Sequence, residues 1–88
     1  FLDDDDVWAP DKLKGQLQAI LETRRDWAYA GDVVIDSELR VLHGAPPPRP
    51  EELMESLQRH NAVPASASNV IASSELLSRV GPFDVCLR

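Results

Sequence analysis

Four consecutive aspartates, Asp3 to Asp6, are the residues of this chain whose type and spacing point most directly to chemistry. Adjacent carboxylates repel one another unless a positive charge lies among them. On an extended backbone successive side chains point to opposite sides, so Asp3 and Asp5 would share one side and the other two aspartates the opposite one. The tetrad therefore predicts a cation site, with Asp3 and Asp5 as its first candidate ligands.

The Asp-x-Asp spacing is compatible with more than one kind of site. A calcium loop of the EF-hand type is excluded, because Val7 and Trp8 stand where it needs polar residues. A phosphatase of the haloacid-dehalogenase type would use Asp3 as nucleophile and Asp5 as acid/base group. Its fingerprint needs further residues along the chain, and the helix expected directly after the tetrad does not fit it. A third interpretation is a divalent cation clamped on a nucleotide diphosphate. The alternative from another class is a non-catalytic acidic interaction module.

The elements that must position the tetrad begin on both sides of it. Phe1 and Leu2 are typical of the buried end of a strand, where open α/β sheets hold their ligands. Pro10 suits the first turn of a following helix, and Lys12 either screens the tetrad or is an ordinary surface residue of that helix. The apolar stripe of this helix consists of Leu13, Leu17, Ile20 and Leu21.

The rest of the chain predicts a hairpin, two further helices and one more strand. Residues 27–35 end in a β-branched run typical of a strand, and a turn near 36–38 returns the chain through 39–43. Prolines make 44–50 an extended surface loop. The elements expected after it are a helix opening at Pro50, a strand over 69–72, a helix capped by Ser73 or Ser74, and a buried segment from Pro82. This alternation indicates an α/β layered domain.

The composition of the 88 residues limits the partners and the compartment. There are 15 acidic and 9 basic residues, for a net charge of -6, and no basic stripe, so no nucleic-acid partner is expected. Cys86 is the single cysteine, which favours a reduced, cytoplasmic chain with a buried, inert thiol. No apolar run approaches the roughly 20 residues of a membrane span. Because the chain starts without a methionine at a strand end, we expect it to be cut from a longer protein.

Three stretches together resemble one enzyme family. "FLDDDDVWAPDKLKGQL" resembles the segment around the Asp-x-Asp motif of inverting family-two glycosyltransferases. "GDVVID" and "LQRHNAVPASASNVIASSELLSRVGPFD" resemble that family's later pattern, in the same order and over nearly the whole chain. The resemblance implies that residues 1–88 are the C-terminal, metal- and acceptor-side part of a catalytic domain of partial GT-A (Rossmann-like) α/β fold, with helices packed on a small mixed sheet.

The resemblance also implies a reaction and its residues. A sugar would pass with inversion from a nucleotide-diphosphate sugar to an acceptor hydroxyl, assisted by Mn²⁺ or Mg²⁺. Asp5 would be the main metal ligand, Asp3 would contact the metal or the ribose of the donor, and Asp6 would support them. The polar positions near the acceptor side are Asn61, Ser66 and Ser68.

Two parts of the family's domain fall outside the matched segment. They are the nucleotide-binding half and the acidic motif that supplies the general base, so we expect the chain alone to be inactive. A parallel sheet is normally covered on both faces by helices. Without the flanking strands and helices, apolar surface would be left open, and we expect the chain to associate with itself.

Overall fold

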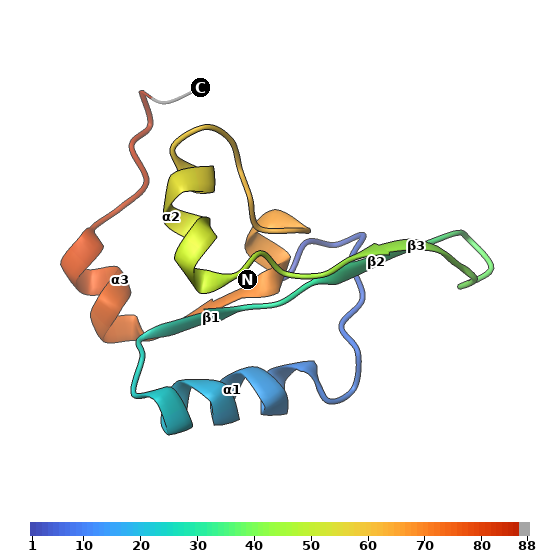
Figure 1. Ribbon diagram of the computed structural model, residues 1–88, viewed down its shortest axis with the longest axis horizontal. Helices are drawn as coiled ribbons and strands as arrows, with labels where there is room; N and C mark the ends of the chain where they lie inside the picture. The colour runs from blue at the N-terminus through green and yellow to red at the C-terminus, as the bar shows by residue number, and fades with distance from the viewer. Residues whose placement is uncertain (87–88) are drawn as a thin grey trace.

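The computed structural model describes residues 1–86, apart from the side chain of Ser66, and forms a small α/β arrangement (Figure 1). Over these residues it contains three α-helices, one 3₁₀ helix and two separate two-stranded sheets. The α/β class is thus confirmed, whereas the expected mixed sheet is wrong, because the strands of both sheets run antiparallel. In chain order the elements are α1 (Lys12–Thr23), β1 (Trp27–Tyr29), β2 (Asp32–Ile35), β3 (Val41–Ala45), α2 (Pro50–Leu57), η1 (Ser66–Asn69), β4 (Val70–Ala72) and α3 (Ser74–Val80).

The first sheet joins two parts of the chain that are far apart in the sequence. Strand β1 pairs with β4, with Trp27 opposite Ala72 and Tyr29 opposite Val70. Helix α1 packs against β1, and Figure 1 shows α1 below this strand and α2 above it. Since η1 leads directly into β4, the pairing brings η1 close to α1. This nonlocal contact frames the candidate site.

The second sheet is the expected hairpin, formed by β2 and β3 with an irregular register between Val34 and Ile35. The strand expected over 27–35 is divided, since its two halves pair with different partners. At the turn, the Asp36 carboxylate accepts hydrogen bonds from the backbone N–H of Arg40 at 3.0 Å and its Nε at 2.8 Å. These bonds from Arg40 lower the pKa of Asp36 below its ordinary value of 3.8. The charged form of Asp36 therefore supports the turn.

Local capping signals account for the two later helices, and both predictions are confirmed. Helix α2 begins at Pro50 and carries Glu51 and Glu52 in its first turn, where negative charge favours the helix dipole. Helix α3 is capped by Ser73, whose Oγ accepts a hydrogen bond from the N–H of Leu76 at 3.1 Å. Each signal lies within a few residues of the helix start, which is why it could be recognised in the sequence.

Helix α1 forms where expected but turns a different face inward. Leu13, Leu17 and Leu21 are 44%, 47% and 78% exposed, whereas Gln16 on the neighbouring face is only 6% exposed. The Nε2 of Gln16 donates a hydrogen bond to the carbonyl oxygen of Asn69 at 2.9 Å. A buried amide must be hydrogen-bonded, and this contact fixes the rotation of the helix about its axis. The helix therefore packs through a polar contact, and the leucine stripe is left in part at the surface.

The two terminal segments lie outside any sheet, contrary to expectation. Phe1 and Leu2 are 66% and 51% exposed and form no strand, and Phe83 and Val85 are 87% and 84% exposed. Cys86, expected to be buried, is exposed as well. The physical reason is the same at both ends: none of the strands in residues 1–86 pairs its backbone with these segments. Their apolar side chains consequently remain at the surface.

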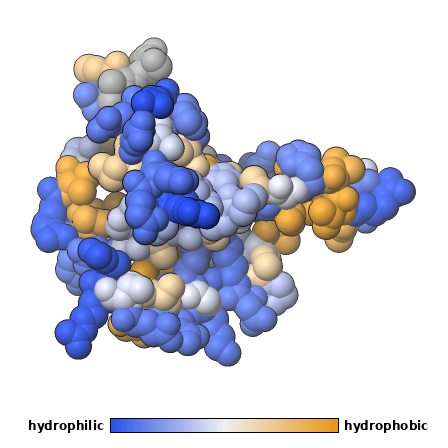
Figure 2. Space-filling model, in the orientation of Figure 1, coloured by the Kyte–Doolittle hydropathy of each residue, from blue (hydrophilic) through white to orange (hydrophobic). Residues whose placement is uncertain are grey.

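The exposed apolar surface leads to a prediction about the oligomeric state. The hairpin projects from the rest of the molecule and carries apolar surface near its end (Figure 2). The exposed apolar side chains of its strands include Val33, Val41 and Leu42. We expect light scattering to give a mass above that of one chain, and Leu42→Lys to reduce the association. Ser37→Lys adds the same charge at an exposed turn residue and should leave it unchanged. A monomer at high protein concentration would contradict this prediction.

Candidate functional site

An open cleft of about 830 Å³ brings part of the aspartate tetrad together with other elements. Asp5 and Asp6 line it from the N-terminal segment, Lys12 from the start of α1, and Asp32 from the start of β2. Ser68 and Asn69 of η1 also line the cleft. Three acidic residues and one lysine, contributed by three segments of the chain, therefore line one space.

The backbone of the tetrad forms a turn and not an extended strand end. The N–H of Asp6 donates to the carbonyl oxygen of Asp3 at 3.2 Å. The expected extended backbone is therefore wrong, and Asp5 and Asp6, not Asp3 and Asp5, line the cleft. A turn redirects neighbouring side chains within a few residues, so the spacing of two no longer places them on one side.

Ser68 holds the segment from Asp3 to Trp8, which contains the tetrad, at both of its ends. Its Oγ accepts a hydrogen bond from the backbone N–H of Asp3 at 3.0 Å, and its carbonyl oxygen accepts one from Nε1 of Trp8 at 2.8 Å. Ser68 is 2% exposed, so both hydrogen bonds are at least partly protected from water. Ser68 was predicted to serve the acceptor side, and what the structure shows is a fixed anchor for the aspartate segment.

Two buried amides, Gln16 and Asn69, connect this anchor to the rest of the fold. The Nδ2 of Asn69 donates to the carbonyl oxygens of Gly31 at 2.9 Å and Pro64 at 3.0 Å. Gln16 accepts from Nζ of Lys12 at 2.7 Å through its Oε1 and donates to the carbonyl oxygen of Asn69. Neither of these residues, nor Asp32, was predicted from the sequence. The one available signal was Gln16 itself, a polar residue within an apolar helical pattern.

Lys12 has an environment unlike that of an ordinary surface lysine. Its Nζ lies 4.3 Å from the centroid of the Trp8 ring, and its side chain is half-buried. Burial lowers the pKa of Lys12, because the charged form loses part of its hydration. The contact with the negative face of the indole ring and the bond to Gln16 hold the ammonium group in place.

The donor chemistry of the cleft suits a hard divalent cation. Mg²⁺ prefers oxygen ligands and is commonly held by one or two carboxylates together with phosphate oxygens of a substrate. Asp5 and Asp6 can supply two such carboxylates, and no residue of the described segment forms a salt bridge with either. Over residues 1–86, no group of three or more His, Cys, Asp or Glu side chains is arranged so that it could hold a metal ion. An ion held by Asp5 and Asp6 would therefore need further ligands from outside the described residues.

Comparison of the chain with protein-family models, with curated proteins and with solved structures finds no match. The helices of the described part include none long and apolar enough to cross a bilayer.

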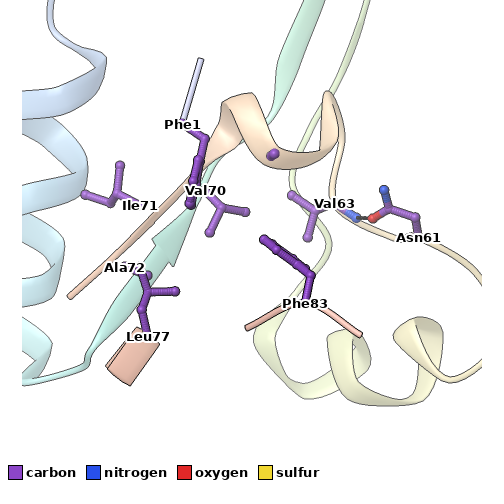
Figure 3. Close-up of a pocket in the computed structure, with 9 residues that line it drawn as sticks. Phe1, Asn61, Val63, Val70, Ile71, Ala72, Leu77 and Phe83 are labelled. Atoms are coloured by element: carbon purple, nitrogen blue, oxygen red, sulfur yellow. Dashed lines mark hydrogen bonds between the residues drawn. The ribbon is translucent and has the colours of Figure 1, made fainter. Parts of the chain in front are cut away.

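The remaining predicted residues do not all reach the cleft. Asn61 lines a separate apolar pocket of about 590 Å³, and Figure 3 shows it beside Val63 and Phe83, with Phe1 on the other side. Its Oδ1 accepts a hydrogen bond from the N–H of Val63 at 3.3 Å. Ser66 begins η1, but its side chain lies outside the described part of the structure. Of the two predicted acceptor-side positions whose side chains are described, Ser68 lies at the aspartate cleft and Asn61 does not.

Proposed function

We propose that this chain is the metal- and acceptor-side part of an inverting glycosyltransferase of GT-A type. The parent protein would transfer a sugar from a nucleotide-diphosphate sugar to an acceptor hydroxyl with the help of Mn²⁺ or Mg²⁺. The proposal is supported by the resemblance of the sequence motifs and by one structural observation: Asp5 and Asp6 line a cleft, and Ser68 bonds the chain on either side of them, at Asp3 and Trp8. The strand expected before the tetrad does not contribute to this support, since Phe1 and Leu2 lie outside the sheets.

The residues of the chain would act by binding and by positioning. Asp5 is the principal ligand in this proposal, Asp6 the second carboxylate at the cleft, and Asp3 a ligand on the strength of the resemblance alone. When bound, the metal ion would neutralise the charge that develops on the leaving diphosphate. Ser68 and Trp8 keep the aspartates in place before the ligand arrives, which reduces the reorganisation that binding requires. The general base is expected outside this chain.

Titration with Mn²⁺ tests the proposal. Second-sphere partners of metal ligands already contribute about tenfold to affinity. Loss of a direct ligand in Asp5→Asn is therefore expected to weaken Mn²⁺ binding by at least about that factor, as measured by the electron paramagnetic resonance signal of free Mn²⁺. Asp11→Asn is the matched control, because it removes the same charge from an exposed residue whose side chain forms no cap on α1.

The outcome also separates the proposal from an acidic interaction module. A general acidic surface attracts cations through its total charge, so both substitutions would then weaken binding by the same small factor. Equal Mn²⁺ affinities of Asp5→Asn and Asp11→Asn would contradict a site at Asp5 and favour the module.

A further inference from the structure

We infer that Lys12 binds an oxygen of the phosphate group that accompanies the metal ion, so that the cleft recognises a metal–diphosphate pair and not the metal alone. This inference rests on the proposed function, and it adds a cationic ligand-binding residue at the same cleft.

Lys12 differs from the paired arginines in what surrounds its charge. Arg40, Arg59 and Arg79 each form a salt bridge with a carboxylate at 2.7 to 3.0 Å. Lys12 lines a cleft together with Asp5, Asp6 and Asp32 and forms no such bridge within the described residues. The carboxylates of the cleft are thus left for other partners, and so is the ammonium group.

The neutral partners of Lys12 leave part of its hydrogen-bonding capacity open. An ammonium group has three N–H donors and no acceptor. One donor is used by the Oε1 of Gln16, and the ring of Trp8 contacts the charge without accepting a conventional hydrogen bond. Both partners hold Nζ at the cleft and do not neutralise it. An anionic oxygen entering the cleft would therefore meet a positioned cation with donors available.

Helix stability does not explain a lysine at this position. Lys12 is the first residue of α1, where the positive end of the helix dipole disfavours a cation. Burial also disfavours the charged form of Lys12 and lowers its pKa. No neighbouring carboxylate among the described residues compensates for this loss of hydration. The contacts with Gln16 and Trp8 nevertheless hold the ammonium group at this unfavourable position. A residue that binds a ligand must be held in place in this way.

The charges of the cleft indicate which anion can enter. Asp5, Asp6 and Asp32 would repel a free anion, whereas an anion that carries a divalent cation presents positive charge to the carboxylates and negative oxygens to Lys12. Lysine is a common ligand of phosphate groups as a compact point charge. A diphosphate that chelates the metal satisfies both requirements. Metal and diphosphate should consequently bind together more tightly than either binds alone.

The test compares Mn²⁺ alone with the preformed complex of Mn²⁺ and inorganic pyrophosphate by isothermal titration calorimetry. Lys12→Gln is expected to weaken binding of the complex by about tenfold, the effect of one charge-assisted hydrogen bond. It should bind Mn²⁺ alone at least as tightly as the unmodified chain, because a positive charge has been removed from the cleft. Lys12→Arg should retain most of the affinity for the complex. Lys14→Gln, on an exposed residue of the same helix, is the charge-matched control.

The two levels of the proposal fail in different ways. In one outcome, Lys12→Gln binds the complex as tightly as the unmodified chain does while Asp5→Asn loses Mn²⁺. This result would contradict the inference about Lys12 and leave the proposed metal site at Asp5 intact. If Asp5→Asn binds Mn²⁺ normally, the proposed function fails and the inference about Lys12 fails with it. Far-UV circular dichroism checks that each variant is folded. If Lys12→Gln is unfolded, Lys12→Arg tests the inference, because a loss of affinity for the complex in this cationic variant would contradict it.

Discussion

Replacing Asn69 with aspartate is expected to destabilise the chain by about 3 kcal/mol, the typical cost of leaving a buried charge without a partner. Asn69 is 6% exposed, and its Nδ2 donates to the carbonyl oxygens of both Gly31 and Pro64. In the variant a carboxylate oxygen would face two carbonyl oxygens at hydrogen-bond distance. A chain of this size has a thin stability margin, so a loss of this magnitude should leave much of it unfolded at room temperature.

The destabilisation by Asn69→Asp should also depend on pH in a defined direction. Burial and the two carbonyl oxygens would raise the pKa of the introduced carboxyl group in the folded state above its unfolded value of about 3.9. The folded state then binds more protons than the unfolded state, so stability falls as pH rises through this range. Below pH of about 4 the group is neutral in both states, and most of the loss should be recovered.

Urea unfolding followed by circular dichroism at two pH values measures both effects. Asn61→Asp is the control, since it makes the same change at an exposed residue and keeps the oxygen that accepts from the N–H of Val63. The control should differ little from the unmodified chain. Equal stabilities of the two variants at neutral pH would show that Asn69 does not hold Gly31 and Pro64 in solution.

The parts of the fold that could be predicted from the sequence are those with local causes. The proline and two glutamates at the start of α2, the serine cap of α3 and the turn at Asp36 each act within about four residues. The pairing of β1 with β4 has no such signal, because each strand has three residues and the partner lies about 40 positions away. For the same reason the division of residues 27–35 between two sheets could not be foreseen.

For the candidate site, the sequence indicated which residues to consider but not how they are arranged. The tetrad and Ser68 were selected by pattern, and the structure brings Asp5, Asp6 and Ser68 to one cleft. The pattern assumed an extended backbone at the tetrad, which the turn from Asp3 to Asp6 replaces. Asp32 lines the same cleft because the hairpin begins close to the tetrad in space. Such a relation is set by tertiary contacts, and spacing along one segment carries no information about it.

Replacing Gly31 or Gly15 with alanine is expected to change the free energy of unfolding in opposite directions. A Cβ atom at Gly31 would overlap the carbonyl oxygen of Ala45 and lie 2.9 Å from Cδ of Pro47. Neither the backbone of β3 nor a proline ring can swing away as a flexible side chain can, so we expect Gly31→Ala to cost about 2 kcal/mol. A Cβ atom at Gly15, inside α1, would meet nothing within 4 Å. Gly15→Ala should therefore stabilise the chain by about 0.5–1 kcal/mol through helix propensity.

The pair forms its own control, because both variants add one methyl group in place of a glycine hydrogen. The cost at Gly31 includes more than the overlap, since its carbonyl oxygen accepts from Nδ2 of Asn69 and any shift of this backbone strains that bond. Gly31→Ala should consequently disturb the wall of the cleft next to Asp32, which amide exchange of β2 would detect as faster opening. A stability equal to that of the unmodified chain would contradict the close packing of Ala45 and Pro47 on Gly31.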